Sequence, residues 1–143
     1  MPYERAWIVA FIDPPNRVRT WYDFFTRPGF RHVIAFCYDP GNDCWLLVDP
    51  SYQGLNIDII PTSDMENILI GIRAMGIIVD VPAIRRRRFK FPLVPLIYCV
   101  PVIQRIIGVP GLIFTPWQLF GALTKMEGAH IFEARHELEG SGA

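Results

Sequence analysis

The chain has 143 residues, 51% of them hydrophobic, with 14 basic and 14 acidic side chains and a formal net charge of zero. This length suits one domain with its own core, and the neutral balance argues against a general nucleic-acid binder, which is usually basic. Thirteen prolines favour short elements and loops over a helical bundle.

Strands are predicted first along the chain. Residues 31–38 and 43–50 are predicted to pair as a hairpin, because "DPGN" (39–42) between them has turn residues in favoured places. A short aromatic segment at 19–30 predicts a helical turn that ends at Pro28-Gly29. Three further runs of apolar and β-branched residues predict strands at 6–12, 55–61 and 77–82.

Three helices are predicted between and after these strands. The segment 62–76 can be capped by Thr62 or Ser63, with Glu66 three residues after Ser63, and Gly76 can end it. A second helix is predicted to begin near Cys99 and to stop at Gly108. The third, at 115–126, has Thr115 as N-cap and Pro116 at the first helical position.

The end of the chain and an internal basic run are expected to be solvated. We predict one α+β domain at 1–126 and a polar, partly disordered tail at 127–143, in which His130 and His136 are surface residues. The run Arg85, Arg86, Arg87, Arg88 predicts an exposed loop. Alternatively, it meets an anionic surface such as nucleic acid or phospholipid head groups.

Cysteine spacing and apolar patterning narrow the class of protein further. Cys37, Cys44 and Cys99 form no CxxC motif and no Cys/His cluster with zinc spacing, so no metal or cofactor is expected. Five prolines cut the most apolar region, 91–123, which therefore predicts core and not a membrane span. The N-terminal apolar run is too short for a secretory signal, which favours the cytoplasm.

The predicted hairpin places a histidine opposite an aspartate. If 39–42 is the loop, residue 38 faces residue 43, and His32 faces Asp49 on the same side of the sheet. A carboxylate there can orient the imidazole and favour its protonated form. A cross-strand charge pair without chemistry is the alternative. The same register pairs Cys37 with Cys44 on the other face, where we assign both thiols to core packing.

Cys99 stands where an apolar run leads into a helix. The N-terminus of a helix has unpaired N–H groups and a positive dipole end, which favour a thiolate and can hold an oxyanion. A thiolate beside His32, itself oriented by Asp49, is the arrangement of nucleophile, base and orienting group found in thiol enzymes. A buried, inert cysteine is the alternative.

These features together resemble a circularly permuted NlpC/P60 domain, a papain-like cysteine peptidase fold in which the histidine strand precedes the cysteine helix. The resemblance covers residues 30–123. It rests on His32 at the head of a strand and on a Trp-containing strand that ends in an acidic residue, 45–49. It also rests on Cys99-Val100 opening a helix, on Gly108-Val109, and on "TPWQL" at 115–119.

The resemblance implies an antiparallel sheet packed against the helix that carries the cysteine. It implies Cys99 as nucleophile, His32 as general base and Asp49 as the third polar residue, acting on a peptide or amide substrate, with a cell-wall peptide as the narrower candidate. Small members of this kind are often encoded by phages, which adds a virion-associated location. A stabilising tyrosine near the nucleophile is also implied, and Trp7, Tyr22 and Tyr98 are the candidates for that position.

Two other functions stay open. One is a lipid acyltransferase or phospholipase-like thiol enzyme, which has a similar order of His and Cys. The other is a non-enzymatic virion or adaptor protein that uses the fold as a scaffold for a protein partner.

Overall fold

The described part of the chain is a layered α+β structure. The computed structural model describes residues 6–13, 29–51, 54–82, 99–109, 111 and 113–133. These residues form the following elements in chain order: β1 (Trp7–Ile12), β2 (His32–Asp39), β3 (Cys44–Ser51), β4 (Gly54–Pro61), α1 (Thr62–Met75), β5 (Gly76–Val81), α2 (Cys99–Ile107), α3 (Pro116–Thr124) and β6 (His130–Glu133).

The strands form one six-stranded sheet in the order β4-β3-β2-β1-β5-β6. Every neighbouring pair in this order is antiparallel. The predicted α+β class with an antiparallel sheet is therefore confirmed, and β1 and β2 lie near its centre, where both faces can be covered.

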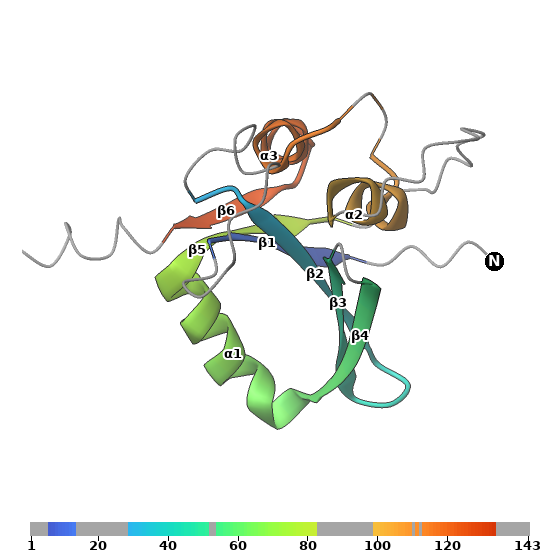
Figure 1. Cartoon of the computed structure of the whole chain (residues 1–143). Coiled ribbons are helices and arrows are strands. Elements are labelled where there is room, and N and C mark those ends of the chain that lie inside the picture. Colours follow the sequence, from blue (N-terminus) through green and yellow to red (C-terminus); the bar gives the residue numbers. More distant parts are fainter. Residues whose placement is uncertain are drawn as a thin grey trace, which may run out of the picture.

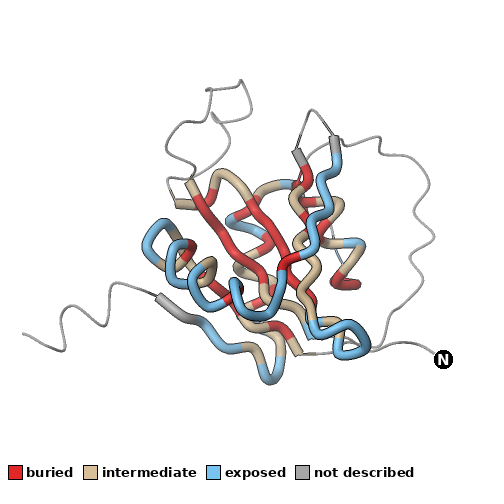
Figure 2. Tube along the Cα trace, turned by 90° about the horizontal axis from the view of Figure 1, so that it is seen from below, coloured by how far each residue is buried: buried red, intermediate tan, exposed pale blue. Residues whose placement is uncertain are grey.

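Helices cover both faces of the sheet (Figure 1). α1 lies on one face, and α2 and α3 lie on the other. Successive strand residues point to opposite faces, and they feed two separate buried clusters. Val9, Phe11, Val33 and Ala35 pack with α2 and α3. Ala10, Ile12, Ile34 and Phe36 pack with α1. Figure 2 shows the resulting buried core of the central strands.

The three predicted helices are present, although α3 ends at Thr124 and not at 126, and Gly76 begins β5. Only one of the predicted N-caps is formed. Thr115 caps α3, since its side chain accepts a hydrogen bond from the Gln118 backbone N–H at 3.3 Å. At α1 the N-cap position is Pro61, which makes no side-chain cap. The capping prediction for α1 was wrong, because Thr62 instead donates to the Asp43 carbonyl at 2.8 Å.

The predicted register of the hairpin was wrong by two residues. Asp39 pairs with Cys44, and Tyr38 pairs with Trp45, so the loop is 40–43. Asp43 adopts a left-handed backbone conformation, with φ of 48°, and its carboxylate accepts from the Tyr38 hydroxyl at 2.7 Å. These contacts move the loop by one residue, from 39–42 to 40–43. The partner of each β2 residue on β3 therefore shifts by two residues. Because neighbouring residues of a strand alternate between faces, a shift of two keeps every side chain on its predicted face.

The sheet extends beyond the predicted domain boundary at residue 126. Residues 130–133, which the sequence assigned to the polar tail, form β6 and pair with β5. His130 is exposed, as predicted. His136, the basic run Arg85–Arg88 and most of the segment 19–30 lie outside the described residues.

The most apolar region gives two helices of nine residues each where the structure describes it. Gly108, with φ of 87°, follows the last residue of α2, and Pro116 begins α3. In the described ranges, none of the helices combines the length and the apolar character that crossing a bilayer requires.

Candidate thiol site

His32 is the first residue of β2, and its side chain contacts Asp49 near the end of β3. The Nε2 atom lies 2.7 Å from the Asp49 Oδ1 atom. The His32 side chain is 18% exposed and that of Asp49 is 37% exposed. The contact is therefore partly shielded from water. A charged pair in such a position attracts more strongly than one on an open surface.

The two side chains meet where the main chains of β2 and β3 separate. Main-chain pairing between the strands runs only as far as Ala35 with Val48. Continued toward His32, this register would put Ser51 opposite the histidine, so Asp49 is a diagonal neighbour. We predicted a directly opposed pair. A diagonal pair is still within reach of long side chains, which is how the predicted contact survives the register error.

Cys99 is the first residue of α2, and it lies within interaction distance of His32. α2 packs on β2 and β3 through Val100 and Ile103, which are both fully buried, in the cluster that includes Val33 and Val48. Cys99 belongs to this cluster and is only 4% exposed. The helix is thus held by its apolar side with its N-terminal residue beside the histidine strand.

The pKa of His32 is raised by its neighbours in the site. Burial by itself lowers this pKa, because a buried imidazolium loses hydration. Hydrogen bonding to Asp49, hydrogen bonding with Cys99 and the charges of both groups act in the opposite direction and raise the pKa of His32 from 6.5 to about 9. His32 is therefore protonated at neutral pH, with Asp49 and Cys99 as its interacting groups.

The contact with Asp49 also fixes the roles of the two ring nitrogens. Nε2 is committed to the carboxylate, so Nδ1 is the nitrogen left to exchange a proton with the Cys99 sulfur. A carboxylate that holds one nitrogen sets the tautomer and orientation of the ring. All three predicted site residues, Cys99, His32 and Asp49, are thus brought together, and the arrangement can pass one proton between the imidazole and the thiol.

One positioning contact was missed from the sequence. Asp13, just after β1, accepts from the Gly29 backbone N–H at 2.7 Å and lies 3.9 Å from the Arg31 guanidinium. These contacts hold the start of β2 beside the end of β1, where Ile12 pairs with His32. The two residues are 16 positions apart in the chain, so the turn residues of "DPPN" gave no signal for this contact.

The other two cysteines have different surroundings. Cys37 is buried, pairs with Leu46, and has its sulfur 3.7 Å from the Tyr38 carbonyl oxygen. Cys44 is half-buried and pairs with Asp39. The predicted pairing of Cys37 with Cys44 was wrong, and none of the three cysteines forms a disulfide. Neither Cys37 nor Cys44 lies at a helix N-terminus.

Of the three aromatic candidates for the site, one is described. Trp7 is half-buried and packs against the cluster that contains Cys99. Tyr22 and Tyr98 lie outside the described residues.

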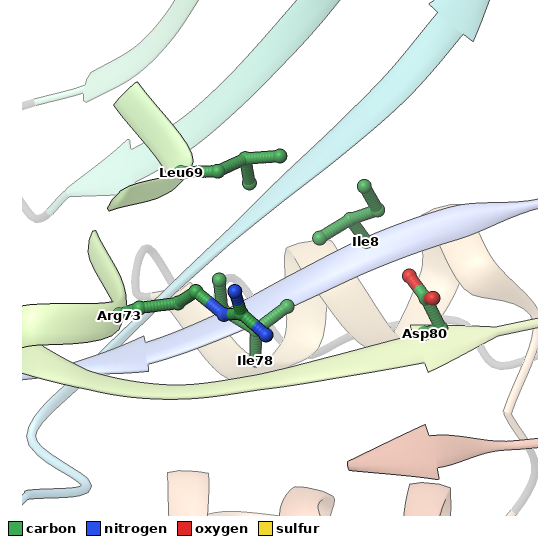
Figure 3. Close-up of a pocket in the computed structure, with 5 residues that line it drawn as sticks. All are labelled: Ile8, Leu69, Arg73, Ile78 and Asp80. Atoms are coloured by element: carbon green, nitrogen blue, oxygen red, sulfur yellow. The ribbon is translucent and has the colours of Figure 1, made fainter. Parts of the chain in front are cut away.

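A separate hollow lies on the opposite face of the sheet, between α1 and strands β1 and β5 (Figure 3). It has a volume of about 210 Å³ and is lined by Ile8, Leu69, Arg73, Ile78 and Asp80. Burial raises the pKa of Asp80. The volume is below the range of roughly 300–1,000 Å³ that is usual for small-molecule sites, so the hollow does not compete with the thiol site.

Among the described residues, no group of His, Cys, Asp and Glu is placed to hold a metal ion.

Comparison of the chain with protein-family models, with curated proteins and with solved structures found no match.

Proposed function

We propose that this chain is a thiol hydrolase with a papain-like, circularly permuted NlpC/P60 architecture, acting as a cysteine peptidase or amidase. Cys99 is the nucleophile, His32 is the general acid and base, and Asp49 is the positioning residue that orients His32. The single observation that supports this most strongly is the placement of His32 between Asp49 and Cys99 with its pKa raised to about 9.

The chemistry is acyl transfer through a thioester. The Cys99 thiolate attacks the carbonyl carbon of an amide, and a tetrahedral oxyanion forms. His32 then donates its proton to the leaving nitrogen, the C–N bond breaks, and an amine departs. Neutral His32 next takes a proton from water, and the resulting hydroxide attacks the thioester. The acid product leaves, and the thiolate–imidazolium pair is restored.

The raised pKa of His32 matches the first half of this cycle. An imidazolium at neutral pH stabilises the adjacent thiolate and is ready to protonate a leaving amine. Asp49 keeps the ring in place and supports its charge, as the third member of such sites does. The N-terminus of α2 adds the positive end of the helix dipole near the sulfur. We propose a peptide or amide as substrate, and a cell-wall peptide as the narrower candidate.

One observation favours a second function. Cys99 is only 4% exposed, which is the burial expected of a structural thiol in a scaffold protein, such as a virion component or adaptor. The thiol enzyme of the lipid acyltransferase type shares the thioester step and differs in the acceptor, which is an alcohol or amine in place of water.

An activated ester tests the proposal and separates these functions. We expect p-nitrophenyl acetate to give a burst of nitrophenolate and an acetyl group on the Cys99 peptide, detected by mass spectrometry. The burst should vanish in Cys99→Ala and persist in Cys44→Ala, the matched control. Transfer of the acetyl group to an added alcohol or amine would identify an acyltransferase. A wild-type chain without Cys99-dependent acylation would overturn the proposal in favour of the scaffold.

A further inference from the structure

The outer strand β4 carries an apolar stripe that no element in the described part of the chain covers. Leu55, Ile57 and Ile59 are 52%, 59% and 70% exposed. Alternate residues of a strand share a face, so the three form one continuous row. Ile57 pairs with Val48, whose side chain lies in the cluster with α2 and α3, so the stripe lies on that same face, beside the helices.

β4 is also an edge of the sheet, and it has few features that block pairing with another strand. It is the terminal strand in the order β4-β3-β2-β1-β5-β6, so the backbone groups on its outer side meet no strand of the sheet. Its register with β3 runs without a skipped residue from Gly54 to Pro61. Edge strands are usually protected by lysines, prolines or bulges. Here the sole charge is Asp58, and the sole proline is the last residue.

The sequence of β4 is complementary to itself. An antiparallel pair of β4 strands centred on Ile57 places Ile57 against Ile57 of the second copy and Leu55 against Ile59 of the second copy. On the other face, Asn56 meets Asp58 of the second copy, which pairs an amide donor with a carboxylate. Each of these is a favourable cross-strand combination.

Neighbouring registers are worse, which makes the fit specific. Centring the pair on Asp58 puts two carboxylates directly opposite each other, and like charges there are destabilising. Centring it on Asn56 leaves Ile59 beyond the end of the second copy's β4. The chain as a whole has no net charge to keep two copies apart.

We propose that this protein forms a twofold symmetric dimer through antiparallel pairing of β4 with β4 of a second copy, centred on Ile57. The two six-stranded sheets become one continuous sheet, and the two apolar stripes meet in one continuous patch. Such a self-complementary contact is the closed arrangement expected of a twofold dimer. This inference is independent of the chemistry proposed for Cys99.

Sedimentation analysis over a wide range of protein concentration tests the dimer. We expect the wild type to shift from monomer to dimer with concentration, and Ile57→Lys to stay monomeric with an unchanged circular dichroism spectrum. Ile70→Lys is the matched control, because Ile70 is also 59% exposed but lies on α1, and it should dimerise like the wild type. A wild type that stays monomeric, or an Ile57→Lys variant that still dimerises, would overturn the proposal.

Crosslinking tests the register without relying on the lysine variant. In a background with Cys44→Ser and Cys99→Ala, Ile57→Cys should form an intermolecular disulfide rapidly on oxidation, since the two sulfurs meet on the symmetry axis. Asp58→Cys is the control, because its residue would face Asn56 of the second copy. Equal crosslinking of both variants contradicts the register. A monomer that binds an extended apolar peptide along β4 contradicts the choice of a second copy as occupant.

Discussion

His32 and Asp49 lie 2.7 Å apart although the strands that carry them are not paired at that point. Backbone pairing therefore does not impose the contact, and the two side chains make it themselves beyond the last β2–β3 pair. In the proposed site, it holds one nitrogen of His32 and leaves the other for Cys99.

Replacing Asp49 should lower the pKa of His32. In Asp49→Asn the charge is gone and the strongest of the raising interactions is weakened, while burial of the ring still acts to lower the pKa. A histidine-ring NMR titration, with His32 assigned through His32→Gln, should give a pKa of about 9 in the wild type and a clearly lower pKa in Asp49→Asn. Identical titrations in the two proteins would show that Asp49 does not act on the ring.

The same pKa predicts how stability depends on pH. A group whose folded-state pKa exceeds its unfolded value holds its proton more tightly when folded, so its contribution is complete below pH 6.5 and is lost as the pH rises through about 9. This contribution is on the order of 3 kcal/mol. Urea unfolding at the two ends of this window should show that loss in the wild type and a smaller loss in His32→Gln. Equal losses in both proteins would contradict it.

The fold was predictable where local sequence signals decide the structure. The class, the order of strands and helices and the cap at Thr115 follow from apolar periodicity and from capping residues. The loop register was not predictable, because it depends on the contacts of Asp43 with Tyr38 and Thr62, which come from elements on either side. β6 was missed because a four-residue edge strand is specified by its partner β5 more than by its own sequence.

The proximity of the three candidate site residues was predictable for a different reason. His32 and Asp49 follow from the parity of a hairpin, which survives a shift of two residues. Cys99 follows from the start of a helix, since Pro101 marks its first turn and Gly108 marks its end. The contact of Asp13 with Gly29 joins separate parts of the chain, and no local pattern specifies it.

The two predicted caps should differ in their effect on stability. Thr115→Ala removes a formed cap on α3, and such losses typically cost about 1 kcal/mol. Ser63→Ala is the control: its hydroxyl donates only to Asp64, at 3.4 Å, and caps no backbone N–H, so its effect should stay within roughly 0.5 kcal/mol. Chemical unfolding of both variants measures the difference, and equal effects would contradict the assigned caps.

Two glycines offer a matched test of the packing. A Cβ atom at Gly76 would overlap the Phe11 carbonyl group across the β1–β5 pair, whereas a Cβ atom at Gly71 meets nothing within 4 Å. Gly76→Ala should therefore destabilise the protein by about 1–3 kcal/mol. Gly71→Ala, in the middle of α1, should stabilise it by up to about 1 kcal/mol. Thermal unfolding of both variants gives the signs, and a stabilised Gly76→Ala would contradict the β1–β5 register.

Activation of Cys99 by His32 is tested most directly by alkylation with iodoacetamide at about pH 6, well below the ordinary thiol pKa of about 8.5. Exposure alone favours Cys44, which is half-buried, over Cys99, which is 4% exposed. Activation by His32 predicts the opposite order. The rate at each cysteine can be followed by mass spectrometry of the labelled peptides. We expect Cys99 to be labelled first in the wild type, and its labelling to be much slower in His32→Ala. The loss of rate in Asp49→Ala should be smaller, because Asp49 acts only through the imidazole. Labelling of Cys44 before Cys99, or a Cys99 rate that is the same in His32→Ala as in the wild type, would contradict the account.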